Sequence, residues 1–258
     1  MHPVLFKIGG CEVISYGVAL GLSFMAVLIL SMLRAKKEGT EPYLVFDAFL
    51  WIFIGVLIGA KLFGLIQNIV KLMNDPFNLF RFNRGGYSSL GGLIGGGIVL
   101  FIFLRRKNTP FLKFTDLISP YLALGFAIQK SFGCLTSGCC YGKPTSLPWG
   151  IVINDTRTPI PAGYLGVPLH PSQVYDALLG VFLFFALVIY RGKIEPLNGK
   201  QGARTFVFLL LFSGGRFFTE FFRGYSSKML GPVSIVQIEF ASLFLVSLIL
   251  YLWKFRRT

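Results

Sequence analysis

The sequence has little charge, few histidines and only one long polar stretch. Charged residues make up 14% of the 258 residues, whereas a soluble domain carries about 25%. There are two histidines and four cysteines, and no two cysteines stand in a CxxC spacing. Because the usual zinc-knuckle pattern is missing, we expect neither a metal nor a cofactor. These shortages argue against a soluble domain.

Apolar residues and glycine are abundant instead. Hydrophobic residues make up 54% of the chain, with 28 phenylalanines and 30 glycines, and a membrane-crossing helix needs about 20 apolar residues. The sequence therefore predicts an all-α membrane protein with about seven transmembrane helices in a single domain, 1–258. The predicted spans are roughly 12–33, 43–67, 86–104, 115–137, 172–190, 203–222 and 233–253. The fourth span, rich in small residues, is a candidate for a broken or re-entrant helix.

The basic residues are spread unevenly over the loops. One side of the predicted topology carries 14 lysines and arginines and the other carries 8, while Lys61, Lys130 and Arg216 fall in or near the spans. Cytoplasmic loops carry the excess of such residues, so we expect the N-terminus outside, the C-terminus inside and an ordered outer loop at about 141–171. The net charge of +14 then indicates topology and not a nucleic-acid partner. The fourteen are Arg34, Lys36, Lys37, Arg105, Arg106, Lys107, Lys113, Arg191, Lys193, Lys200, Arg204, Lys254, Arg256 and Arg257.

Ionisable side chains at membrane depth are rare and usually functional. Arg216 and Glu220 stand four residues apart, so on a helix they share one face and form an ion pair. Such a pair either stabilises a helix contact or presents the planar guanidinium to a phosphate or carboxylate. Arg223 either joins them or extends to the membrane surface. The same two alternatives, function or extension to the surface, apply to Lys61 and Lys130.

Three further features carry open alternatives. Gly91 and Gly92 lie in a glycine-rich run that suits either close helix packing or the approach of a lipid headgroup. His170, the only internal histidine, is either a loop-fixing residue or a base near the outer face. Cys134, Cys139 and Cys140 are interpreted first as small buried residues, with a disulfide or a reactive thiol as the alternatives.

Several short motifs are spread along the chain. They are the segments 15–17, 59–62, 85–95, 116–120, 138–145, 148–150, 170–175 and 216–223. They cover nearly the whole chain, and the His-Pro-Ser-Gln and Arg…Glu-Phe-Phe-Arg elements are the specific ones. Together these motifs resemble the prolipoprotein diacylglyceryl transferase family.

The resemblance implies a multi-pass enzyme of the bacterial inner membrane. It implies transfer of the diacylglyceryl group from phosphatidylglycerol to the cysteine thiol of a prolipoprotein, with signal peptides and membrane lipid as partners and no nucleic acid. It assigns catalysis to His170, Arg216 and Glu220. The lipid- or phosphate-binding residues are then Tyr16, Lys61, Gly91, Gly92, Lys130, Gln173 and Arg223.

The sequence also departs from the family pattern at polar positions. Leu90 replaces a histidine or tyrosine, Phe212 replaces a tyrosine, and Lys130 or Ser131 stands at an arginine position. An alternative function is therefore a diverged paralogue. It would bind lipid or lipoprotein signal segments, or act on a different lipid or acceptor, without the usual activity.

Overall fold

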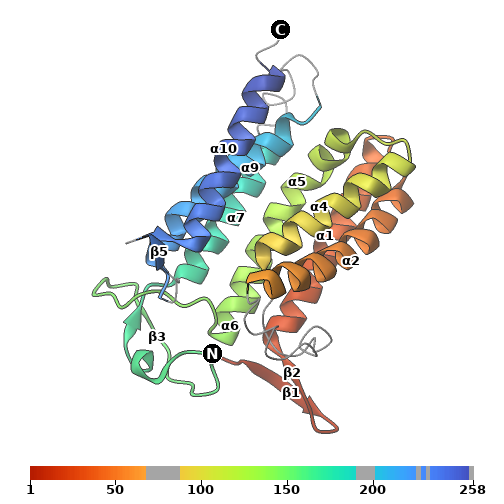
Figure 1. The fold of residues 1–258 in the computed structure, drawn as a ribbon. Coiled ribbons are helices and arrows are strands. Elements are labelled where there is room, and N and C mark those ends of the chain that lie inside the picture. Colours follow the sequence, from red (N-terminus) through yellow and green to blue (C-terminus); the bar gives the residue numbers. More distant parts are fainter. Residues whose placement is uncertain (68–87, 190–200, 225–227, 231–232, 256–258) are drawn as a thin grey trace. The chain divides into compact units, whose positions relative to one another are not determined.

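The computed structural model describes residues 1–67, 88–189, 201–224, 228–230 and 233–255, with the backbone alone at Cys11, Gln67, 89–90 and 228–230. Seven long helices account for most of this part of the chain (Figure 1). They are α1 (Ser15–Lys37), α2 (Pro42–Gln67), α4 (Ser89–Arg106), α5 (Phe111–Ile128), α7 (Ser172–Ile189), α9 (Ala203–Thr219) and α10 (Ile235–Phe255).

The helices confirm the predicted all-α membrane fold. Within the described residues, six helices are long and apolar enough to cross a membrane, and α4 occupies the third predicted span. The chain is therefore a multi-pass membrane protein. Its predicted orientation stays a prediction, because the structure contains no membrane.

The fourth predicted span is helical throughout. The helix α5 runs into a π-helical segment, η2 (Gln129–Cys134), and then into the short helix α6 (Leu135–Ser137). Pro120 lies inside α5 without ending the helix. The wider π-helical turn, and not a break, is thus the irregular feature of this span, and such turns are frequent at functional sites.

Residue contacts divide the chain into two compact units, and the second of them consists of residues 31–114. In this unit α2 packs along α4 through glycines that leave room for backbone contact. A Cβ atom on Gly95 would lie 2.8 Å from the Cα atom of Gly59, and one on Gly55 would lie 2.8 Å from the carbonyl oxygen of Gly95. The glycine-rich run therefore serves close helix packing, the first of its two predicted roles.

We expect Gly95→Ala to destabilise this helix pair by about 1–3 kcal/mol, because the added methyl group meets backbone that cannot move aside alone. The matched control is Gly97→Ala, where a Cβ atom would have no heavy atom within 4 Å. Thermal unfolding of the two variants in detergent compares them directly. Equal midpoints for both variants would contradict the predicted close packing.

The first unit, residues 1–30 and 115–258, contains α7, α9, α10 and most of α1 and α5. Here α9 packs against both α7 and α10 (Figure 1). In the described part of this unit, three antiparallel strand pairs lie outside the helices. They are β1 (Val4–Ile8) with β2 (Cys11–Ile14), β3 (Ile151–Val152) with β4 (Pro168–Leu169), and β5 (Lys228–Leu230) with β6 (Val233–Ser234).

The predicted loop at about 141–171 is ordered. Tyr141, Ile153, Ile160 and Leu169 form a small buried apolar cluster, and the pair β3–β4 closes the loop. Among the described residues two short 3₁₀ helices also occur, η3 (Ala162–Tyr164) in this loop and η4 (Glu220–Phe222) after α9. The ordered loop leads directly into α7.

Asp116 caps a helix other than its own. It lies inside α5, and its carboxylate caps the start of α9. The backbone N–H of Gly202 donates to Oδ2 at 2.5 Å, and the backbone N–H and hydroxyl of Thr205 donate to Oδ1 at 2.8 and 2.7 Å. Because the N-cap residue Gly202 has no side chain to offer, a carboxylate from another helix satisfies the free N–H groups.

Asp116→Asn is expected to destabilise the protein by about 1–2 kcal/mol, since one acceptor oxygen of the cap becomes an N–H₂ donor. Asp47→Asn is the control: Asp47 is half-buried on α2 and makes no hydrogen bond or ion pair to the described residues. We expect a lower thermal unfolding midpoint for the Asp116 variant only. Equal midpoints for the two variants would rule out a stabilising role of the Asp116 cap.

Candidate functional site

A completely buried carboxylate, that of Asp176, is the centre of a cluster of charged side chains in the first unit. Arg216 donates from one terminal nitrogen to Oδ1 at 2.5 Å, and Arg223 donates to Oδ2. The ammonium group of Lys130 lies 3.5 Å from Oδ2. The hydroxyl of Thr219 also donates to Oδ1, at 2.8 Å. One carboxylate therefore pairs with three cations.

Four structural elements supply the members of this cluster. Lys130 comes from the π-helical segment η2, Asp176 from the second turn of α7, and Arg216 from the last turn of α9. Glu220 and Arg223 follow on η4 and directly after it. The cluster thus depends on the close packing of α7 against α9 and on the turn that η2 adds to the fourth span.

Glu220 is the second carboxylate of the cluster. Its Oε2 lies 3.5 Å from a terminal nitrogen of Arg216 and 3.4 Å from Nε of Arg223. The ion pair predicted from the four-residue spacing of Arg216 and Glu220 is therefore confirmed. Arg223 is the second arginine that forms an ion pair with the Glu220 carboxylate.

Counting charges over the cluster gives an excess of positive charge. Lys130, Arg216 and Arg223 contribute three positive charges, and Asp176 and Glu220 contribute two negative ones, which leaves +1. The side chains are between 0 and 12% exposed. Because a buried charge is unfavourable without a counter-charge, the cluster is suited to receive one further anion.

Sequence reasoning missed Asp176. The signal was available: an acidic residue follows the His-Pro-Ser-Gln motif by three positions and stands inside an apolar run. Arg216 and Glu220 were selected because ionisable side chains at membrane depth are usually functional. The same argument applies to Asp176.

Three of the predicted cationic side chains are largely buried, which excludes the alternative that they extend to the membrane surface. Arg223 is 2% exposed and Lys61 is 4% exposed, so neither extends to the membrane surface. Lys130, with a side chain 12% exposed, does not either. Lys61 belongs to α2 in the other unit, and its predicted lipid contact stays a prediction.

His170 lies in an aromatic group just before α7. Its Nδ1 is 3.2 Å from the hydroxyl of Tyr175, which also accepts a hydrogen bond from Nε1 of Trp149 at 2.9 Å. Its ring centroid lies 5.0 Å from that of Phe222. Within the described part of the chain, His170 forms no ion pair with the carboxylates of the cluster.

Gln173 and Ser172 hold the loop that follows the fourth span. Gln173 Nε2 donates to the carbonyl of Cys139 at 2.8 Å, and Ser172 Oγ donates to the carbonyl of Cys140 at 2.6 Å. Arg223 donates to the same Cys140 carbonyl at 3.0 Å. Gln173 Oε1 is buried and has no hydrogen-bond partner among the described residues, so this acceptor is available to a ligand.

The remaining predicted site residues lie on α1 and α4. Tyr16 is in the first turn of α1, is 40% exposed, and lies beside Gln129 of η2 and the three cysteines described next. Gly91 and Gly92 face α2, where added Cβ atoms would meet the side chains of Phe63 and Val56. The side chain of Leu90 and the start of the glycine-rich segment, 84–87, fall outside the described residues.

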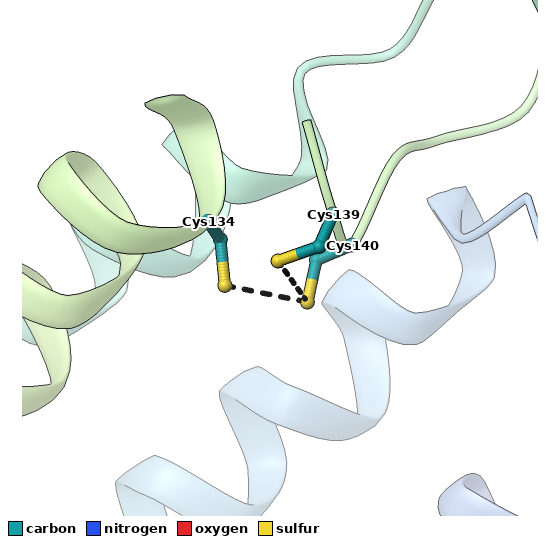
Figure 2. A group of neighbouring side chains, drawn as sticks. All are labelled: Cys134, Cys139 and Cys140. Atoms are coloured by element: carbon teal, nitrogen blue, oxygen red, sulfur yellow. Dashed lines mark hydrogen bonds between the residues drawn. The ribbon is translucent and has the colours of Figure 1, made fainter. Parts of the chain in front are cut away.

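Three cysteines converge beside the charged cluster (Figure 2). The sulfur of Cys134 lies 3.4 Å from that of Cys140, and the sulfur of Cys139 lies 3.9 Å from it. Hydrogen bonds from Cys134 and Cys139 lower the pKa of the Cys140 thiol, and the charges of Lys130 and Arg223 act in the same direction. The predicted small buried role describes Cys134 fully, but Cys139 and Cys140 are only half-buried.

Comparison with known proteins gives consistent matches along the chain. The family model described as prolipoprotein diacylglyceryl transferase matches residues 3–253. The phosphatidylglycerol–prolipoprotein diacylglyceryl transferase of Clostridium tetani is 31% identical over 258 residues, covering 100% of this chain and 98% of the relative. The enzymes of Pseudoalteromonas atlantica and Clostridium perfringens (transferase 2) are each 30% identical, covering 100% and 95% of this chain and 90% and 92% of the relatives.

Proposed function

This chain belongs to the prolipoprotein diacylglyceryl transferase family, and from that premise we propose that it transfers the diacylglyceryl group of phosphatidylglycerol to a prolipoprotein cysteine. The observation that carries the proposal is the buried cluster of Lys130, Asp176, Arg216, Glu220 and Arg223 with its net charge of +1. A phosphodiester carries a single negative charge. It therefore balances the cluster.

The chemistry is a displacement at carbon. The sulfur of the acceptor cysteine, as thiolate, forms a bond to the terminal glyceryl carbon, and the bond from that carbon to the phosphate oxygen breaks. Glycerol phosphate leaves with the electron pair. Negative charge then grows on the phosphate, and fixed cations in a dry site stabilise it with little reorganisation.

The arginines are the residues that we assign to the phosphate. Arg216 and Arg223 are each held by Asp176 and Glu220, so their planar groups are oriented before the lipid binds. Lys130 adds a point charge. Gln173 Oε1, which has no hydrogen-bond partner among the described residues, is the acceptor that we assign to a glycerol hydroxyl.

His170 is the residue that we assign to the proton of the acceptor thiol. In the tautomer that this role needs, Nδ1–H donates to the hydroxyl of Tyr175, 3.2 Å away, and Nε2 keeps its lone pair. Tyr175 has a second lone pair for Trp149 Nε1. The lipid contacts predicted for Tyr16, Lys61, Gly91 and Gly92 are not needed for this step.

Complementation tests the function directly. A bacterial strain depleted of its own transferase expresses this chain together with a reporter lipoprotein, and the reporter is analysed by mass spectrometry. We expect a thioether-linked diacylglyceryl group on the reporter cysteine. An unmodified reporter beside well-expressed, folded protein would contradict the proposal and favour the diverged paralogue that binds without catalysis.

A further inference from the structure

Three cysteine sulfurs meet at one point at the end of the fourth span, and the reaction proposed above uses none of them. Cys134 closes η2, whereas Cys139 and Cys140 follow α6. The three sulfur atoms lie within 4.8 Å of one another, and two of the separations are 3.4 and 3.9 Å (Figure 2).

The backbone is shaped to bring these sulfurs together. Gly138 takes a φ of +71°, and Cys140 takes a φ of +60°. A non-glycine residue in this left-handed region is disfavoured by about 1–2 kcal/mol, and such residues persist where the surrounding structure enforces them. Here the carbonyls of Cys139 and Cys140 are fixed by Gln173, Ser172 and Arg223.

Polar groups also face the sulfurs. Lys130 Nζ lies 3.6 Å from Sγ of Cys140. The side-chain amide of Gln129 lies against Sγ of Cys134, with Nε2 at 3.5 Å and Oε1 at 3.8 Å. A neutral thiol is a weak hydrogen-bond acceptor. A cation beside a sulfur is expected instead where the sulfur is a metal-bound thiolate. Groups next to such a ligand orient it and balance its charge.

We propose that Cys134, Cys139 and Cys140 bind one zinc ion as thiolates. Zinc–sulfur bonds of about 2.3 Å in a tetrahedron place the sulfurs about 3.8 Å apart, close to the separations found. Three thiolates and Zn²⁺ carry one net negative charge, and the ammonium group of Lys130 lies 3.6 Å from one of these sulfurs. The three thiols release three protons to solvent as the ion binds, and no oxidation is involved.

A disulfide is the competing outcome, and the geometry favours it less. A bond between Cys134 and Cys140 would leave Cys139 as an unused thiol in a conformation that brings it to the same point. It would also leave Lys130 facing an uncharged sulfur. A zinc ion would account both for the convergence of all three sulfurs and for the position of Lys130 beside Cys140.

The ion would also fix Lys130, which touches both Cys140 and Asp176 at 3.6 and 3.5 Å. The proposal itself does not rest on the transferase function, because it needs only the sulfurs and their surroundings. A protein that binds zinc without transferring lipid satisfies this inference and contradicts the function above.

Metal analysis of the full-length protein, purified in detergent, tests the site. We expect about one zinc ion per chain in the wild-type protein and at least a fivefold lower content in Cys134→Ser and Cys140→Ser. Thr136→Ser, a change in the same helical turn that leaves the sulfurs in place, is the matched control and should keep its zinc.

A second measurement does not depend on the folding of variants. Chelator-treated wild-type protein is titrated with zinc and with cadmium, whose bonds to thiolates give a sulfur-to-metal absorption band. Uptake of one equivalent with loss of three of the four reactive thiols supports the site. Four free thiols without uptake, or a Cys134–Cys140 disulfide found by peptide mass mapping, overturns it.

Discussion

Replacing Asp176 with asparagine is expected to lower transferase activity at least a hundredfold and to destabilise the protein by about 3–5 kcal/mol. The change leaves Lys130, Arg216 and Arg223 opposed by Glu220 alone, so the net charge of the buried cluster rises from +1 to +2. Removing one partner of a buried ion pair has an effect of this size. Reporter lipidation measures the first effect, and thermal unfolding in detergent measures the second.

Two comparisons isolate the cause of the Asp176 effect. Asp155→Asn removes a carboxylate from a loop, where the partner Arg157 is 61% exposed, and should change neither quantity appreciably. Adding Lys130→Gln to Asp176→Asn returns the net charge to +1, and we expect part of the stability to return with it. Wild-type activity and stability in Asp176→Asn would remove this residue from the site.

Replacing Arg216 with lysine is expected to reduce activity at least a hundredfold while the protein remains folded. The guanidinium contacts Asp176 and Glu220 through different nitrogens, at 2.5 and 3.5 Å, and lies 5.1 Å from the ring centroid of Phe240. An ammonium group keeps the charge but reaches one partner at a time. Loss of one fixed donor to a developing anion has a hundredfold to thousandfold effect in other enzymes.

Arg157→Lys is the matched control for this substitution. Arg157 forms its ion pair with Asp155 in the loop, so the same chemical change there should leave activity intact. Reporter lipidation and detergent unfolding of both variants are compared with the wild type. Full activity in Arg216→Lys would exclude a role for the planar group in holding phosphate.

Local features of the sequence predicted the helices well. The apolar runs placed all seven helices within a few residues, because the length of a membrane-crossing helix follows from the thickness of the hydrocarbon layer. The four-residue spacing predicted the pair of Arg216 and Glu220, because it depends only on the geometry of one helix. The glycine run predicted a close contact but did not decide between a helix and a lipid as the partner.

Contacts between distant segments were not predictable in the same way. Asp116 lies within α5 and caps α9, about 90 residues further along the chain, and no local pattern around it indicates that contact. Asp176 was overlooked although the sequence around it was singled out. Its partners come from η2, α9 and the turn after η4, and no local pattern shows that these meet.

The sequence by itself determined the membrane class, the helices, the family and the individual residues able to carry charge at membrane depth. Each of these depends on composition or on spacing within one segment. Only the tertiary structure decided which charges face one another, because a buried charge is stable only beside a counter-charge that the fold brings to it. The shared carboxylate of Asp176, the net charge of +1 around it and the three converging sulfurs are all properties of that packing.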